Sequence, residues 1–294
     1  MSEPRPRIGY LGLGLMGAPM AQRLLKAGYD VVVWNRSKAK LGPVVADGAQ
    51  EASSPADLAR QVDIVLMCVT DAKAVEAVVF GEEGIAGVNG PRALVDFSSI
   101  HPEAARDLAA RLQVANGMAW IDAPVSGGIP GAENGTLAIM AGGDAEDIDY
   151  VRPVVMNLCA RLTHMGPTGA GQATKLCNQI ISGCTITIVA EAVAFAEKSG
   201  VDAARLTEAL KGGFADSIPF QLFAPRMAAK EFEPPYGTVL TMLKDLDTVA
   251  AIGDEVGARL PMTSNAIAVM RETEARGDAE VDISAMIKSF INVQ

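Results

Sequence analysis

Short apolar runs alternate with amphipathic segments along the first half of the chain. The runs have the length and the Val, Ile and Leu content of buried strands, and the segments between them repeat apolar residues at helical spacing. Strands are predicted at Ile8–Leu11, Asp30–Trp34, Ile64–Val69, Ala93–Phe97 and Ala119–Ala123. Helices are predicted between them, among others at Met16–Ala27, Ala72–Val79 and Pro102–Val114. This alternation predicts an α/β domain, a doubly wound parallel sheet covered by helices on both faces.

The strand pattern stops after about residue 165, and the rest of the chain predicts helices. The longest, Ala173–Ser199, would extend about 40 Å at about 1.5 Å per residue. Asp202 and Asp282 are candidate caps for two of the shorter helices. These are predicted at Ala203–Lys211, Gly237–Val256, Thr263–Arg276 and Ile283–Ile291. We therefore predict a sheet domain over residues 1–165 and an all-helical domain over residues 166–294.

Length and composition agree with two folded domains and narrow the choice of partners. The chain has 294 residues, and at about 150 residues per domain this length fits two. Hydrophobic residues make up 49%, which excludes disorder as the main state. The net charge of −10 predicts no non-specific binding to nucleic acid, because phosphate affinity comes from Lys and Arg. The two histidines, His101 and His164, are far apart, so no metal site is predicted.

No membrane span and no export signal is predicted. The uncharged run Leu176–Ala190 contains polar residues and is shorter than the roughly 20 residues that a membrane helix needs. Ile8–Ala21, preceded by Arg5 and Arg7, resembles the start of a signal peptide, but its glycines fit another pattern. No Cys-x-x-Cys pair occurs, and buried, reduced thiols are predicted for Cys68, Cys159, Cys177 and Cys184. We expect a cytoplasmic protein.

A glycine-rich loop follows the first predicted strand and opens the first predicted helix. Gly12, Gly14 and Gly17 form the pattern G-x-G-x-x-G, and Leu13, Leu15 and Met16 complete the loop. In this strand–turn–helix context the pattern is typical of a Rossmann dinucleotide-binding domain. Gly12 would allow the tight turn, Gly14 the approach of a pyrophosphate, and Gly17 the packing of the helix. The alternative is a plain glycine-rich turn.

The end of the second predicted strand indicates which dinucleotide binds. NAD-binding proteins usually place Asp or Glu here to accept hydrogen bonds from the ribose hydroxyls. This chain instead has Asn35, Arg36 and Ser37. Arg36 could pair with the 2′-phosphate of NADP, and Asn35 and Ser37 could donate hydrogen bonds to it. We therefore favour NADP(H) over NAD(H), although the arginine could also merely stack on adenine.

A second glycine-rich segment, Asp122–Met140, reads as a loop after a predicted strand. Ser126 is followed there by Gly127 and Gly128, whose exposed backbone N–H groups would suit a small anionic group such as a carboxylate. The segment lies at the carboxyl end of a strand, where open α/β sheets bind ligands. A structural loop without a ligand is an equal alternative.

Lys175 lies early in the long predicted helix and precedes a run of uncharged residues. Asn178 and Gln179, three and four positions on, share its helical face. A partly buried lysine has a pKa lowered by desolvation and can act as a general acid or base. The alternative is a lysine on a solvated helix face.

These motifs together resemble the β-hydroxyacid dehydrogenase family, which includes 3-hydroxyisobutyrate dehydrogenase, tartronate semialdehyde reductase and glyoxylate/succinic semialdehyde reductase. The resemblance covers essentially the whole chain. It rests on four blocks in order, namely Ile8–Met20, Asp122–Gly143, Gly169–Gln179 and Lys244–Leu246. It implies a Rossmann domain that holds the nicotinamide cofactor and a helical domain that completes the cleft and forms oligomer contacts. The expected chemistry is hydride transfer to or from a small carboxylate-bearing semialdehyde or hydroxyacid.

The resemblance also implies roles for individual residues. Lys175 matches the catalytic acid/base, and Ser126, Gly127 and Gly128 match the residues that hold the substrate carboxylate. The remaining substrate-binding positions are Asn178, Gln179 and Asp245, the last also supporting Lys244. Beyond the glycine loop and the Arg36 segment, the cofactor-binding positions are Val69, Thr70, Ser99 and Lys244.

The chain departs from many relatives at two places. It has Asn178-Gln179 where many have two asparagines, and Gln can make the same hydrogen bonds from a longer arm. Relatives often carry an aromatic residue near the position of Gly237, and in this chain Tyr236 is adjacent to it. The shape of the substrate pocket, and therefore the identity of the substrate, stays open.

Two rival functions remain. An imine reductase has a similar plan, but such enzymes usually carry Asp or Tyr at the position of Lys175. A non-catalytic NADP-binding scaffold is the other rival. The long helix further predicts a homodimer or homotetramer.

Overall fold

The computed structural model describes residues 5–291 and separates into two compact units, residues 1–175 and 176–294. The division falls inside the long helix α8 (Ala170–Lys198), rather than ahead of it at residue 165 as predicted. The reason is that the start of α8 is bonded into the first unit, where the Asp122 carboxylate accepts hydrogen bonds from the Gly169 and Gln172 N–H groups.

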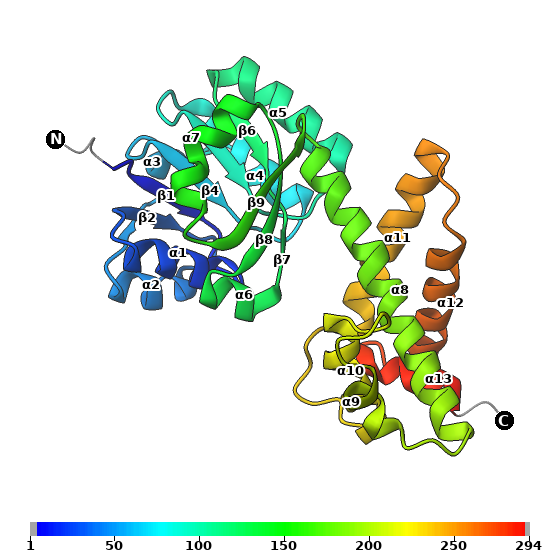
Figure 1. Ribbon diagram of the computed structural model, residues 1–294. Coiled ribbons are helices and arrows are strands. Elements are labelled where there is room, and N and C mark those ends of the chain that lie inside the picture. Colours follow the sequence, from blue (N-terminus) through cyan, green and yellow to red (C-terminus); the bar gives the residue numbers. More distant parts are fainter. Residues whose placement is uncertain (1–4, 292–294) are drawn as a thin grey trace. The chain divides into compact units, whose positions relative to one another are not determined.

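The first unit is built on one sheet, and Figure 1 shows its strands between flanking helices. Within residues 5–291 the sheet has nine strands in the order β3-β2-β1-β4-β5-β6-β8-β7, with β9 paired to β8. The strands are β1 (Ile8–Leu11), β2 (Val31–Trp34), β3 (Gln50–Glu51), β4 (Ile64–Met67), β5 (Ala93–Asp96), β6 (Ala119–Asp122), β7 (Val125–Ser126), β8 (Leu137–Gly142) and β9 (Cys159–Gly166). All five strands predicted from the apolar runs are therefore present.

Alternate residues of the strands pack on opposite faces of the sheet, and helices cover both faces. Tyr10 and Val33 belong to one buried cluster, whereas Leu11 and Val32 belong to the other. The first cluster is covered by α1 (Gly17–Lys26), α2 (Gly42–Ala46), α6 (Gly128–Asn134) and α7 (Ala145–Val155). The second is covered by α3 (Pro55–Ala59), α4 (Ala72–Phe80) and α5 (Pro102–Asn116). Burial on both faces explains why these strands are continuous apolar runs.

The predicted fold class is confirmed, and the far edge of the sheet adds an antiparallel pairing to it and corrects one local expectation. The strands from β3 to β6 pair in parallel, but β8 runs antiparallel to both β6 and β7, so the sheet is not purely parallel. The segment after Asp122, predicted as a loop, contains β7, α6 and β8. The strand–helix–strand arrangement was not predicted, because the many glycines of the segment are typical of a loop. In the structure Gly127, Gly128 and Gly135 take positive φ values at the ends of α6.

The second unit is helical, as predicted. Its elements after α8 are η3 (Ala203–Arg205), α9 (Leu206–Leu210), α10 (Ile218–Ala229), α11 (Val239–Val256), α12 (Pro261–Ala275), η4 (Ile283–Met286) and α13 (Ile287–Ile291), with η1 (Lys38–Lys40) and η2 (Ile85–Gly87) in the first unit. Asp202 and Asp282 cap η3 and η4 by accepting from Ala204 N and Ser284 N, which confirms both predicted caps. Helix α10 was missed because Pro225 lies inside it and prolines indicate helix breaks.

Helix α8 is long and apolar enough to cross a membrane by length and composition alone, with a mean hydropathy of 1.6 over its most apolar window. The sequence prediction considered only the uncharged run Leu176–Ala190 and did not identify this longer apolar helix. Half of that window is buried inside the structure, where Ile186, Val189 and Val193 pack in the core of the second unit. A core helix of a soluble protein passes the same test, so the helix by itself is weak evidence for a membrane.

The cysteines only partly match the prediction of buried thiols. Cys159 is buried, Cys68 and Cys184 are half-buried, and all four are free. Cys177 is exposed, so the prediction is wrong there. At this point the side of α8 that packs against the core carries Leu176 and Ile180, so Cys177 faces away from the core.

Candidate functional site

The glycine loop between β1 and α1 has the geometry that the motif predicts. Gly12 has φ +94°, and a Cβ there would collide with the Cys68 carbonyl oxygen. A Cβ on Gly17 would collide with the Gly12 carbonyl oxygen, so this glycine lets α1 start directly against the loop. A Cβ on Gly14 would have no heavy atom within 4 Å beyond its chain neighbours. Its backbone is therefore open, which fits the approach of a pyrophosphate at the N-terminal end of α1.

The end of β2 is tied to this loop through Asn35. The Leu13 N–H donates to Asn35 Oδ1 over 2.8 Å, and Asn35 Nδ2 donates to the Ser37 carbonyl oxygen, also over 2.8 Å. Asn35 therefore already uses its amide to join the two cofactor segments. Arg36 and Ser37 are exposed, and the exposed Lys38 and Lys40 follow on the 3-10 turn η1. Three exposed cationic side chains within a span of five residues therefore follow the end of β2.

The candidate cofactor residues after β4 and β5 lie at the same edge of the sheet. Val69 N donates to Ser98 Oγ over 2.9 Å, which joins the loops that follow these two neighbouring strands. Thr70 is exposed, and its hydroxyl donates to Asp71, the N-cap of α4. Ser99 is exposed beside the buried Ser98. The carboxyl ends of β1, β2, β4 and β5 thus present the predicted cofactor positions of the first unit on one edge, whereas Lys244 lies in the second unit.

Ser126 ends the short strand β7, and the two glycines after it lead into α6. Gly127 has φ +132° and Gly128 has φ +61°, conformations that other residues rarely adopt. Both glycines are exposed. The segment therefore presents consecutive backbone groups to solvent next to a hydroxyl, an arrangement that suits a carboxylate.

Lys175 lies on the second turn of α8 and is half-buried. The start of the helix is held by Asp122, whose two carboxylate oxygens accept from Gly169 N over 2.7 Å and from Gln172 N over 2.8 Å. Burial raises the pKa of Asp122 to about 6, and the backbone donors oppose that rise. Asp122 was predicted only as the first residue of the second glycine-rich segment. The sequence signal for its role in holding α8 is a carboxylate at the end of an apolar strand.

The second unit brings three of the predicted substrate residues together. Asn178 Nδ2 donates to Gln179 Oε1 over 2.8 Å, and Gln179 Nε2 donates to Asp245 Oδ2 over 2.5 Å. Gln179 is buried, and Asn178 and Asp245 are half-buried. Lys244, the neighbour of Asp245 on α11, is exposed. The longer arm of Gln179 thus bridges α8 and α11 within this unit.

Asp96 is a buried acid at the end of β5 that no sequence motif indicates. It is fully buried, its Oδ1 accepts from Ser98 N over 2.9 Å, and its Oδ2 has no hydrogen-bond partner. It lies opposite Asp122 in the register of β5 and β6. Burial, with the nearby Asp122 charge, raises the pKa of Asp96 to about 7.

We expect Asp96→Asn to stabilise the first unit at high pH. Folding raises this pKa, so the favourable contribution of Asp96 is fully present below its unfolded pKa of about 4 and is lost as pH rises through about 7. The variant should gain on the order of 4 kcal/mol in unfolding free energy at pH 8 relative to pH 4, because the pKa rises by about 3 and each pKa unit corresponds to about 1.4 kcal/mol. Urea unfolding followed by tryptophan fluorescence measures this, because Trp34 and Trp120 both lie in the first unit. An equal gain in Asp107→Asn, at an exposed acid of α5, would contradict it.

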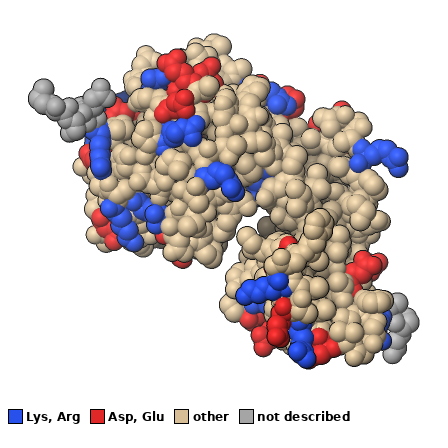
Figure 2. Space-filling view, in the orientation of Figure 1, with Lys and Arg blue, Asp and Glu red and all other residues tan. Residues whose placement is uncertain are grey.

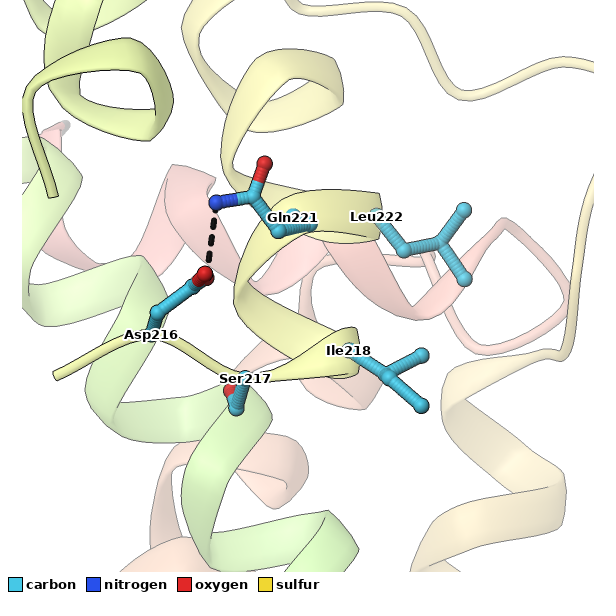
Figure 3. Close-up of a pocket in the computed structure, with 5 residues that line it drawn as sticks. All are labelled: Asp216, Ser217, Ile218, Gln221 and Leu222. Carbon is cyan, nitrogen blue, oxygen red and sulfur yellow. Dashed lines mark hydrogen bonds between the residues drawn. The ribbon is translucent and has the colours of Figure 1, made fainter. Parts of the chain in front are cut away.

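A pocket of about 530 Å³ opens at the start of α10 and contains none of the predicted site residues (Figure 3). It is lined by Asp216, Ser217, Ile218, Gln221 and Leu222. Gln221 Nε2 donates to Asp216 Oδ1 over 2.7 Å, and Ser217 caps α10, so the polar groups drawn there serve the local turn. We assign the site to the sheet edge and α8 rather than to this pocket.

Neither a single charged surface patch nor a metal centre marks the site within the described residues. On the face shown in Figure 2, basic and acidic side chains lie interspersed in small groups. Among residues 5–291, no three His, Cys, Asp or Glu side chains gather in an arrangement that could hold a metal ion. The chemistry of the site therefore centres on the exposed cations after β2, the glycine backbone and Lys175.

Comparisons with known proteins agree with this geometry. The profile described as the NAD binding domain of 6-phosphogluconate dehydrogenase matches residues 7–166. The profile of the NAD-binding domain of NADP-dependent 3-hydroxyisobutyrate dehydrogenase matches residues 169–290. The chain is 36% identical to 2-hydroxy-3-oxopropionate reductase of Escherichia coli over 97% of each chain.

Solved structures add the fold of the whole chain. A Mycobacterium tuberculosis 3-hydroxyisobutyrate dehydrogenase structure with L-serine aligns at a TM-score of 0.87 and 29% identity, covering 97% of this chain and 99% of that one. A Streptomyces aurantiacus imine reductase aligns at 0.65 and 24% identity, over 96% and 98% of the two chains, which shows a shared fold alone. The protein is therefore a member of the β-hydroxyacid dehydrogenase family of NAD(P)-dependent oxidoreductases.

Proposed function

We propose that the protein is an NADP(H)-dependent reductase of small carboxylate-bearing semialdehydes, or the dehydrogenase of the matching hydroxyacids, with Lys175 as general acid and base. The observation that carries the proposal is the half-buried Lys175 on a helix whose start is fixed to the carboxyl edge of a dinucleotide-binding sheet. The relatives named as reductase and dehydrogenase of such acids support the same substrate class.

Each candidate site residue would have a separate role in the proposed hydride transfer. A nicotinamide cofactor held along the glycine loop would supply the hydride chemistry, by donating to the aldehyde carbon or accepting from the alcohol carbon. Lys175, as an ammonium, gives a proton to the developing alkoxide, and as a neutral amine it takes the hydroxyl proton in the oxidative direction. Ser126 with the N–H groups of Gly127 and Gly128 holds the substrate carboxylate. Asn178 and Gln179, supported by Asp245, orient the substrate.

The cofactor would lie along the glycine loop. The open backbone at Gly14 would receive the pyrophosphate, and Val69, Thr70 and Ser99 would line the path toward the nicotinamide. Lys244 on α11 is a further candidate for cofactor binding, which rests on the family resemblance of the block Lys244–Leu246. Arg36 would pair with the 2′-phosphate, and the absence of a carboxylate from Asn35, Arg36 and Ser37 supports NADP(H) over NAD(H).

A substrate panel tests the proposal directly. NADPH consumption at 340 nm should be rapid with at least one of glyoxylate, succinic semialdehyde, tartronate semialdehyde and methylmalonate semialdehyde. The matched control is a neutral aldehyde of the same length, which should react about 10–100-fold more slowly because it forgoes the charge-assisted bonds at Ser126. Equal rates on both would contradict the carboxylate site. Turnover of a cyclic imine alone would favour the imine reductase alternative, and tight NADPH binding without any turnover would favour a scaffold.

We also propose a homodimer or homotetramer with α8 at the interface. In the second unit Ile181, Ile188 and Phe195 are spaced by seven residues on this helix and are 68%, 52% and 72% exposed. An apolar stripe of this kind is typical of a helix covered by a partner. Sedimentation velocity at micromolar concentration should show an oligomer, and a monomer would refute the interface.

We infer a cytoplasmic protein, with α8 as a core and interface helix and not a membrane span.

A further inference from the structure

A buried chain of hydrogen bonds connects the cofactor edge of the sheet to the start of α8. Its members are Ser98, Gln172 and Asp122, each 2% exposed or less. They lie on the loop after β5, on α8 and at the end of β6. The network lies wholly in the first unit, which also contains Lys175.

Asp122 anchors the first turn of the helix. The first N–H groups of an α-helix lack partners within the helix, and a carboxylate there is favoured by the helix dipole. Both oxygens of Asp122 are used, one by Gly169 N and the other by Gln172 N. The approach to β6 is close, because a Cβ on Gly171 would lie 2.5 Å from the Asp122 carbonyl oxygen. The helix start therefore has little freedom to move against β6.

Gln172 extends the network to the cofactor loop. Its Nε2 donates to the Ser98 carbonyl oxygen over 2.7 Å, and its Oε1 accepts from Ile100 N over 3.2 Å. One side chain thus holds both residues that flank Ser99. Ser98 Oγ in turn accepts from Val69 N. The same three side chains therefore fix two loops with candidate cofactor contacts and the helix that carries Lys175.

We propose that Asp122 and Gln172 are positioning residues that set Lys175 in register with the cofactor edge. This rests on the proposed role of Lys175. Lys175 follows Gln172 by three positions on a continuous helix, so a shift of the helix start shifts the lysine. A displacement of about 1 Å at a reacting group can cost about 10²-fold in rate. A network that served only stability would leave kcat per folded molecule unchanged.

A double-mutant cycle separates these possibilities. Asp122→Asn keeps the size of the side chain but turns an amide NH₂ toward one of the two backbone donors. With NADPH and the aldehyde of the panel that is reduced fastest, it should lower kcat per folded molecule about 10–100-fold. In a Lys175→Ala background it should lower kcat less than about 3-fold, because the group it positions is gone. The Kd for NADPH should stay within about 3-fold of wild type.

Gln172→Met provides a second cycle if Asp122→Asn does not fold, since its backbone N–H can still donate to Asp122. It should show the same dependence on Lys175, with a weaker affinity for NADPH because Ser98 and Ile100 lose their partner. Val151→Ala, in the buried core on α7 and outside the network, is the matched control. It should lower the unfolding midpoint without lowering kcat per folded molecule.

The outcomes are distinguishable. Losses that multiply in the double variants, with Lys175→Ala itself strongly impaired, would overturn the positioning role and leave the proposed function intact. Unchanged kcat in both network variants would do the same. Full turnover by Lys175→Ala would overturn the proposed function and the positioning role together.

Discussion

Replacing Lys175 with alanine is expected to lower kcat about 10²–10⁴-fold, which is the typical contribution of a general acid–base group. The methyl group of alanine can neither give the proton to the alkoxide nor take it from the alcohol, so the transferred hydride leaves an uncompensated charge on the substrate oxygen. Steady-state rates at saturating NADPH and aldehyde measure the effect. The Kd for NADPH, from quenching of tryptophan fluorescence, should change little because the glycine loop and Arg36 are untouched.

Lys198→Ala is the matched control, since Lys198 lies on the last turn of the same helix and is exposed. It should retain wild-type kcat. Lys175→Arg should remain impaired, because a guanidinium cannot release its proton near neutral pH and its fork differs in shape from an ammonium. Near-full turnover in Lys175→Ala would show that another group moves the proton.

Reversing the charge at Arg36 is expected to change the cofactor preference by about 10²–10³-fold in the ratio of kcat/KM for NADPH to that for NADH. Arg36 is exposed at the end of β2, and Lys38 and Lys40 follow it. In Arg36→Glu the carboxylate would repel the 2′-phosphate and could accept from the ribose hydroxyls of NADH. Most of the change should appear in KM for NADPH, with kcat little altered, because the adenine end is remote from the transferred hydride.

Arg161→Glu, at an exposed arginine of β9, makes the same change of net charge and should leave the ratio unchanged. This control excludes a general effect of charge on the association of an anionic cofactor. A wild-type enzyme that prefers NADH, or an Arg36→Glu variant with an unaltered ratio, would show that Arg36 does not select the cofactor.

Several elements could be predicted because their signals are local. The strands β1, β2, β4, β5 and β6 are short apolar runs buried on both faces. Two caps, at Asp202 and Asp282, followed from residue type alone. Helix α10 was not predicted, because it contains Pro225. Tertiary packing holds this helix despite the missing backbone donor.

The sequence by itself determined the kind of domain, the glycine loop and the position of Lys175 on a long helix, because periodicity and motif spacing are properties of neighbouring residues. Only the tertiary structure decided what fixes that helix. Asp122 bonds to a residue 47 positions away, and Gln172 reaches Ser98 across 74 positions. The mixed edge formed by β7 and β8 was likewise decided by pairing across the sheet. Contacts of this kind leave no periodic trace in the chain, since they depend on which strand ends the fold brings side by side.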